Sequence, residues 1–312
     1  MSVNELLPTV VTLALLLAVG YVGGRVGVVN EVSTERLSAL ILKIGQPFLI
    51  INALISQKFS PENLKTGLTI LLLGICMHAV MAGIAYLLAK PIKKPDEHKL
   101  SEYCMFFANC GFIGFPILES IFGDFGLFCG AFYVISFHLF VWSLGIKIFA
   151  RGRDDIKITP RKMLLNFGTV PSIIGFLIFI SGVTLPSPVY SLASSLNSMC
   201  TPIALIISGA NLSRRSLRVM FKNPAVYYTN AVKLLIMPIL MSTMLWLCGL
   251  PDYMIVFGAV MAAMPCAAVV TMFGETYNVS PGFAAELVGS SSLLCVLTIF
   301  PTVSYANFLT GL

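Results

Sequence analysis

The 312-residue chain contains little charge, little histidine and little tryptophan. Asp, Glu, Lys and Arg together make up 11% of the residues, and there are three His and two Trp. A soluble domain carries roughly 25% charged residues, so this composition argues against a soluble fold. The eight Cys form no Cys-x-x-Cys pair and no cluster with His at metal-ligand spacing, and no metal site is expected. The chain also lacks a phosphate loop, a Gly-x-Ser-x-Gly elbow and a His-Glu-x-x-His motif, which argues against an enzyme.

What the chain has in abundance is long apolar runs. Hydrophobic residues make up 57% of the sequence and the mean hydropathy is +0.90. An α-helix needs about 20 mostly apolar residues to cross the hydrocarbon layer. Ten segments meet this condition: Leu6–Val29, Leu37–Ile55, Leu64–Ala89, Leu100–Phe122, Phe125–Phe149, Thr169–Leu185, Val189–Ala210, Ala225–Leu250, Tyr253–Tyr277 and Pro281–Leu309. The sequence therefore predicts an all-α membrane protein with ten transmembrane helices, whose general partner is the lipid bilayer.

Basic residues concentrate on alternate junctions between these segments. The odd-numbered junctions hold fifteen Lys and Arg, whereas the even-numbered ones hold only Lys58 and Lys65. The fifteen are Arg25, Arg36, Lys90, Lys93, Lys94, Lys99, Arg151, Arg153, Lys157, Arg161, Lys162, Arg214, Arg215, Arg218 and Lys222. The positive-inside rule places these junctions in the cytoplasm and both termini outside, in the plasma (inner) membrane. The net charge of +6 then faces lipid headgroups, and no nucleic-acid partner is expected.

A helix-breaking octet, Asn109–Pro116, interrupts the fourth segment. The two halves of the chain echo each other: Pro47 and Pro202 lie 155 residues apart, and Pro116 and Pro265 lie 149 apart. Because each half would hold five spans, an odd number, the second copy must enter the membrane from the opposite side. The pattern thus predicts two inverted repeats, with chance recurrence of proline in membrane helices as the alternative.

These residues carry a family resemblance that covers nearly the whole chain. The motifs are Asn109 to Pro116 with Ile117-Leu118, Thr201-Pro202-Ile203-Ala204, Lys233 before Pro238, and Met264-Pro265 leading to Glu275-Thr276-Tyr277. They resemble the auxin efflux carrier family, which includes the plant PIN proteins and bacterial malate and malonate permeases. The resemblance implies two inverted five-helix repeats (1–150 and 169–312) joined by a cytoplasmic connection (151–168), with helices four and nine crossing as broken helices. It further implies a scaffold of helices 1, 2, 6 and 7, a transport core of helices 3–5 and 8–10, and a homodimer formed through the scaffold.

The chemistry of a broken helix points to an anion site. A break near Gly111–Pro116 leaves a half-helix whose N-terminus, with free N–H groups and a positive dipole end, points at the bilayer centre. A break near Pro265 does the same from the other side, and such ends bind carboxylates. We expect Asn109 to add an amide, Gly111 and Gly114 to allow close approach, and Pro116 and Pro265 to hold the helices open. Alternatively, Asn109 only satisfies the interrupted backbone.

Lys233 lies near mid-depth in the eighth segment, where an unpaired ammonium is costly, and is therefore a substrate-binding candidate. It would balance substrate charge or stand where a coupling cation would bind; the alternative is a salt bridge with Glu119 or Glu286. Glu119, Glu286, Ser290 and His78 are candidates for a coupling-ion or proton site, and His78 and the Glu286–Ser290 track have packing as their alternative. No cofactor is expected beyond coupling to Na⁺ or H⁺.

The sequence therefore predicts a secondary active transporter that carries a small organic anion, such as malate, malonate or an auxin-like acid, by alternating access. An anion channel is the first alternative, because a broken-helix crossover can also line a pore. A membrane scaffold or sensor that transports nothing is the second, but it would give mid-membrane Asn109 and Lys233 no function.

Overall fold

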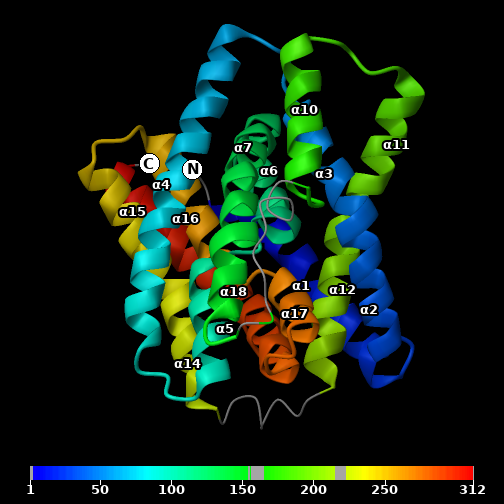
Figure 1. Cartoon of the computed structure of the whole chain (residues 1–312). Helices are drawn as coiled ribbons and strands as arrows, with labels where there is room; N and C mark the ends of the chain where they lie inside the picture. The colour runs from blue at the N-terminus through cyan, green and yellow to red at the C-terminus, as the bar shows by residue number, and fades with distance from the viewer. Residues whose placement is uncertain (1–2, 154, 156–164, 215–222, 312) are drawn as a thin grey trace.

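The computed structural model describes residues 3–153, 155, 165–214 and 223–311, and Figure 1 shows these as a bundle of helices. No β-strand occurs in this described part of the chain; its only extended pairing is an isolated antiparallel bridge between Ala108 and Cys266. Six of the basic residues predicted on the cytoplasmic side lie outside the described residues: Lys157, Arg161, Lys162, Arg215, Arg218 and Lys222.

Seven helical stretches within the described residues are long and apolar enough to cross a membrane. Three are single helices: α1 (Val3–Arg25), α4 (Pro61–Ala89) and α18 (Pro281–Thr310). Three contain a π-helical turn: α2 (Glu31–Leu40), Ile41–Gly45 and α3 (Gln46–Leu54); α7 (Asp124–Phe140), Val141–Gly145 and α8 (Ile146–Ala150); α14 (Pro224–Ala231), Val232–Ile236 and α15 (Met237–Leu247). The seventh joins α11 (Ser187–Ser198) to α12 (Cys200–Ser213).

The remaining three predicted segments are shorter or interrupted. The fourth consists of α5 (Pro95–Phe106), a break, and a half-helix formed by the π-turn Cys110–Gly114 and α6 (Phe115–Phe122). The sixth is the short helix α10 (Thr169–Ser181), and the ninth consists of α16 (Asp252–Ala263), a break and α17 (Val269–Thr276). The breaks in the fourth and ninth segments were expected from the sequence.

The chain turns at two ends of the bundle. The connection from α3 to α4 and that from α10 to α11 lie at the top of Figure 1, whereas α2 and α14 begin near the bottom. The described basic residues Arg25, Lys90 and Arg214 therefore belong to bottom-end junctions, as the alternation of charge requires. The side of the membrane that this end faces stays a prediction.

Helices α1 and α12 share the most extensive contact of any pair of elements in the described chain. A Cβ added at Gly20 would lie 2.2 Å from the Ile206 carbonyl oxygen, and one at Gly209 would lie 2.0 Å from the Leu17 carbonyl oxygen. Only glycine allows this backbone approach, which is how small residues bring membrane helices together. Gly20 and Gly209 therefore serve the packing of α1 against α12 within one chain.

Charged pairs join elements at the bottom end. The buried carboxylate of Glu102 on α5 accepts two hydrogen bonds from the Arg151 guanidinium, at 2.6 and 2.9 Å. These bonds raise the pKa of Arg151 above its usual value, against partial burial, which lowers it. The guanidinium also lies 5.8 Å from the Tyr86 ring centre, so one residue ties α4, α5 and the end of α8 together.

Candidate functional site at the crossing of two broken helices

The break in the fourth segment occurs earlier than the glycines and proline suggest. Helix α5 ends at Phe106, Phe107 is extended (φ −91°, ψ 128°), and the half-helix begins directly after Asn109. Pro116 lies inside this half-helix and has no N–H to donate to the preceding turn; the Phe112 carbonyl, four residues before it, accepts a hydrogen bond from the Thr201 hydroxyl at 2.8 Å instead. The N-terminus of the half-helix is therefore at Asn109 and Cys110, several residues before Pro116.

The break in the ninth segment follows from Pro265. Proline disfavours the helical region for the residue before it, and Met264 is extended (φ −61°, ψ 146°). The main chain leaves α16 at Ala263 and re-enters a helix at Val269. The Cys266 amide donates to the Ser291 hydroxyl of α18 at 3.0 Å, which anchors the interrupted segment.

The two interrupted segments cross and hydrogen-bond to each other. The backbone N–H of Asn109 donates to the Pro265 carbonyl at 2.8 Å, and the backbone N–H of Ala267 donates to the Phe107 carbonyl at 3.2 Å. Backbone groups in hydrocarbon need hydrogen-bond partners within the protein. Each break supplies a donor and an acceptor to the other. This pairing makes the crossing a defined structure and not two independent kinks.

The amides at the start of both half-helices precede the first intrahelical hydrogen bonds, and those of Cys110 and Gly111 face the Cys110 thiol. The first intrahelical bond after the fourth break runs from Gly114 to the Asn109 carbonyl at 3.1 Å, so the amides from Cys110 to Ile113 precede it. After the ninth break, the first bonds run from Val270 and Thr271 to the carbonyls of Ala267 and Ala268. Both half-helices thus begin at the crossing with their positive dipole ends.

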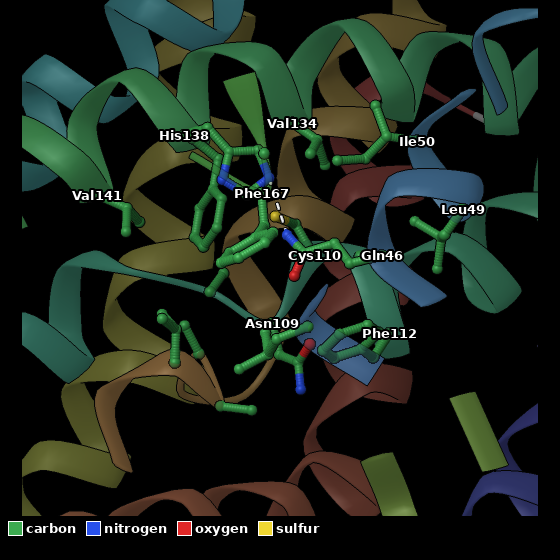
Figure 2. A pocket seen from close by; sticks show the side chains of 18 of the residues that line it. Gln46, Leu49, Ile50, Asn109, Cys110, Phe112, Val134, His138, Val141 and Phe167 are labelled. Carbon is green, nitrogen blue, oxygen red and sulfur yellow. Dashed lines mark hydrogen bonds between the residues drawn. The ribbon is translucent and has the colours of Figure 1, made fainter. Parts of the chain in front are cut away.

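A cavity lies directly beside these two ends. Its volume is about 100 Å³, counted as the space open to the centre of a water-sized sphere. One water needs roughly 10–15 Å³ of such space, so the cavity has room for several. Figure 2 shows His138 and Val141 on the left and Leu49 and Ile50 on the right, with Cys110 and Gln46 between them and Asn109 below. Most of its lining is apolar or aromatic; the other members are Leu42, Ala108, Gly111, Phe112, Val134, Phe137, His138, Val141, Trp142, Phe167, Gly168, Ala267, Ala268, Val269 and Met272. No Lys, Arg, Asp or Glu is among them.

Of the predicted substrate-binding residues, Asn109 and Gly111 line this cavity. Asn109 is 5% exposed, and its side-chain amide hydrogen-bonds to none of the described residues, so both of its polar ends are available to a solute. A Cβ added at Gly111 would meet only the Leu49 Cδ2 atom, at 4.0 Å, so this glycine leaves open space in the cavity. Gly114 instead packs against Met261 and Met264, outside the cavity.

Two polar residues of the cavity were not among the predicted site residues. The Gln46 Nε2 atom lies 3.0 Å from the His138 Nε2 atom, and Figure 2 draws this hydrogen bond across the cavity wall. The backbone of Gly168 covers the His138 ring, since a Cβ there would lie 2.2 Å from it. Gln46 precedes Pro47, one of the recurring prolines, and this position was its sequence signal. The signal for His138 was the same as that for His78, a single histidine in an apolar segment.

A larger cavity of about 500 Å³ adjoins the first. The two share Leu42, Phe112, Phe167, Ala268 and Met272. The larger one extends along α2 and α12 and reaches Glu35, Lys43 and Glu275, so charged side chains occur there and not in the smaller cavity. A solute leaving the smaller cavity past the shared residues would enter the larger one.

Lys233 lies in the π-turn Val232–Ile236 and is completely buried. It lines neither cavity. Its Nζ atom has no hydrogen-bond partner, so a salt bridge with Glu119 or Glu286 is not formed. Its electrostatic neighbours are the thiols of Cys104, Cys110, Cys266 and Cys295 and the ring of His78.

The other predicted residues lie apart from the cavities. Glu119 is exposed on α6, and Glu286 is buried on α18, one turn before Ser290. The Ser290 hydroxyl accepts a hydrogen bond from the Asn230 amide at 2.8 Å. His78 bonds the Gly74 carbonyl at 2.7 Å and is packed among aromatic rings. None of these four residues lines a described cavity.

Comparison with known proteins agrees with the class that the apolar helices and the crossing indicate, a membrane transport protein. A model of the family described as "membrane transport protein" matches residues 6–301, nearly the whole chain. The chain belongs to this family, which is the auxin efflux carrier family that its motifs resemble, and it is a transport protein and not an enzyme.

Two relatives are each described as an uncharacterized transporter. The chain is 28% identical over 221 residues to an uncharacterized transporter of Methanocaldococcus jannaschii, covering 67% of this chain and 70% of the relative. It is 24% identical over 304 residues to an uncharacterized transporter of Methanothermobacter thermautotrophicus, covering 93% and 95%.

Proposed function

We propose that this protein is a secondary active transporter that carries a small organic anion with a carboxylate group, by alternating access. The observation that carries the proposal is the cavity at the crossing, into which two half-helix N-termini and the Asn109 amide converge. Free amides at helix N-termini bind anions without a dedicated cation. In this proposal the amides of Cys110 to Phe112 and the Asn109 side chain bind the carboxylate.

The proposed architecture has ten spans in two inverted five-helix repeats, 1–150 and 169–312, joined by 151–168. The first, second, sixth and seventh spans form the scaffold, the remaining six form the core, and both termini lie outside. In support, the cavity lies between α2–α3 on one side and α7 and the crossing on the other. The hydrogen bonds from Gln46 to His138 and from the Thr201 hydroxyl to the Phe112 carbonyl would join scaffold to core in this state, and would break when the core moves.

The lining of the cavity favours a substrate with one carboxylate and an apolar body. A second carboxylate would lie among aromatic and aliphatic side chains with no Lys or Arg to pair with, and burying such a charge is costly. Within the predicted group of malate, malonate and auxin-like acids, we therefore expect the monocarboxylates to be carried best.

The test is uptake of labelled malate, malonate, lactate and indole-acetate into proteoliposomes. We expect saturable uptake and counterflow for at least one monocarboxylate, with strong loss in Asn109→Ala. Asn63→Ala, at the start of α4 and away from the cavity, is the matched control. Full activity of Asn109→Ala would place the site elsewhere, and single-channel currents in place of counterflow would favour an anion channel. Repeating uptake without Na⁺ and without a pH gradient tests coupling at Glu286 and Ser290.

A further inference from the structure

Lys233 is a buried basic group that the binding site does not use. An ammonium in a membrane interior is costly unless it is paired or serves a function. Here the side chain is 0% exposed and its Nζ atom has no hydrogen-bond partner. No packing role requires a lysine there, because any long apolar side chain would fill the same space without that cost.

The lysine lies behind the crossing, as seen from the cavity. Its π-turn packs against α5, α16 and α18, the elements that end at or anchor the two breaks. Cys110 lines the cavity and also interacts electrostatically with Lys233, whereas Lys233 itself does not reach the cavity. One layer of residues, formed by the two interrupted segments where they cross, therefore separates the ammonium of Lys233 from the solute.

The charge acts through this layer because nothing there screens it. The cavity lining contains no Lys, Arg, Asp or Glu, and its polar side chains are Gln46, Asn109 and His138. Electrostatic interactions are long-ranged in such a low-dielectric region. An anion in the cavity would thus experience the field of the Lys233 ammonium across the crossing, whereas Lys43 lines the adjoining larger cavity.

We propose that Lys233 balances the cargo's carboxylate from behind the crossing, so that the two charges cancel in the core loaded with a monoanion and the charge of Lys233 is uncancelled in the empty core. This inference rests on the proposed transport function. It predicts that the loaded core crosses the membrane field with its cargo charge cancelled by Lys233, whereas the returning empty core carries the uncancelled charge. Exchange of a monocarboxylate is then insensitive to voltage, and net uptake is sensitive to it. A dicarboxylate leaves one negative charge uncancelled.

The experiment compares exchange and net uptake in proteoliposomes whose potential is set with K⁺ and valinomycin. The probe is labelled lactate or indole-acetate, whichever the parent carries faster, with unlabelled acid inside for exchange. The variants are Lys233→Met, which removes the charge at similar volume, Lys233→Arg, which keeps it, and Lys147→Met, which removes an exposed lysine on α8.

In Lys233→Met we expect exchange to become voltage-dependent, because the cargo charge of the loaded core is no longer cancelled. Net uptake stays voltage-dependent, because one negative charge still crosses the membrane in each cycle. One charge crossing the whole field over a symmetric barrier changes a rate by up to about sevenfold per 100 mV. Lys233→Arg and Lys147→Met should behave as the parent. Because the Met variant loses an unpaired buried charge, its thermal unfolding temperature in detergent should not fall, which separates a charge effect from misfolding.

The inference is overturned if Lys233→Met shows the same voltage dependence as the parent in both modes, or if Lys147→Met shows the same shift as Lys233→Met. A parent protein that carries none of the acids would refute the proposed function itself, a different outcome from either of these.

Discussion

Adding a single methyl group at Gly111 should make the protein more stable and at the same time a poorer transporter. Gly111 lies in the half-helix that begins at the crossing and does not have a positive φ, so alanine fits its backbone. The new Cβ would meet only Leu49, at 4.0 Å. Replacing glycine by alanine in a helix contributes about 0.5–1 kcal/mol to stability. The methyl would occupy the cavity beside the first amides of the half-helix.

The loss of function can be estimated from the bond that the methyl would prevent. A hydrogen bond to a charged group contributes about 1.5–3 kcal/mol, so losing one N–H contact to a carboxylate should raise KM roughly 10- to 150-fold. The assays are thermal unfolding in detergent and concentration-dependent uptake in proteoliposomes. Gly83→Ala is the matched control, since a Cβ at this helical glycine of α4 meets nothing within 4 Å. It should gain similar stability and keep its KM. Equal KM values for Gly111→Ala and Gly83→Ala would refute the assignment of the anion site.

Three further predictions concern the structure around the site. Glu102→Gln should lower stability by about 1–2 kcal/mol, measured by thermal unfolding, because Arg151 loses its charged partner but stays partly hydrated; an unchanged melting temperature would show that the pair contributes nothing. Gly209→Val should sharply reduce the yield of monodisperse protein in size-exclusion chromatography, since its Cβ would collide with the backbone of α1, and a normal yield would contradict that packing. Ser291→Ala should reduce both stability, by about 1–3 kcal/mol, and uptake, because the buried Cys266 amide loses its acceptor; parent-like unfolding and uptake would argue against this anchor.

The presence of the two breaks could be predicted from the sequence, but their positions could not. Proline and glycine mark interruptions, and Pro265 does direct the extended backbone at Met264. In the fourth segment, however, the break lies at Phe107–Asn109, and Pro116 is inside the following half-helix. The deciding factor is the hydrogen-bonded pairing with the ninth segment, a contact between residues more than 150 positions apart that no local pattern encodes.

Which side chains reach the cavity was also only partly predictable. Asn109 follows from its place at the break, since an amide beside free N–H groups has an evident use. His78 and His138 are equivalent by sequence, each alone in an apolar segment, yet only His138 lines the cavity. The orientation of a helix about its own axis decides this, and that orientation depends on packing against the other helices. Lys233 illustrates the same point, because its depth is readable from the sequence whereas the side of the crossing that it occupies is not.

The most direct test of the account is a structure determined with a transported monocarboxylate bound. We predict that the carboxylate lies beside the crossing, within hydrogen-bonding distance of the Asn109 amide and the backbone amides of Cys110 to Phe112, with the apolar body toward Leu49 and Ile50. A substrate bound elsewhere, with the crossing empty, would contradict the central claim that two broken helices form the anion site.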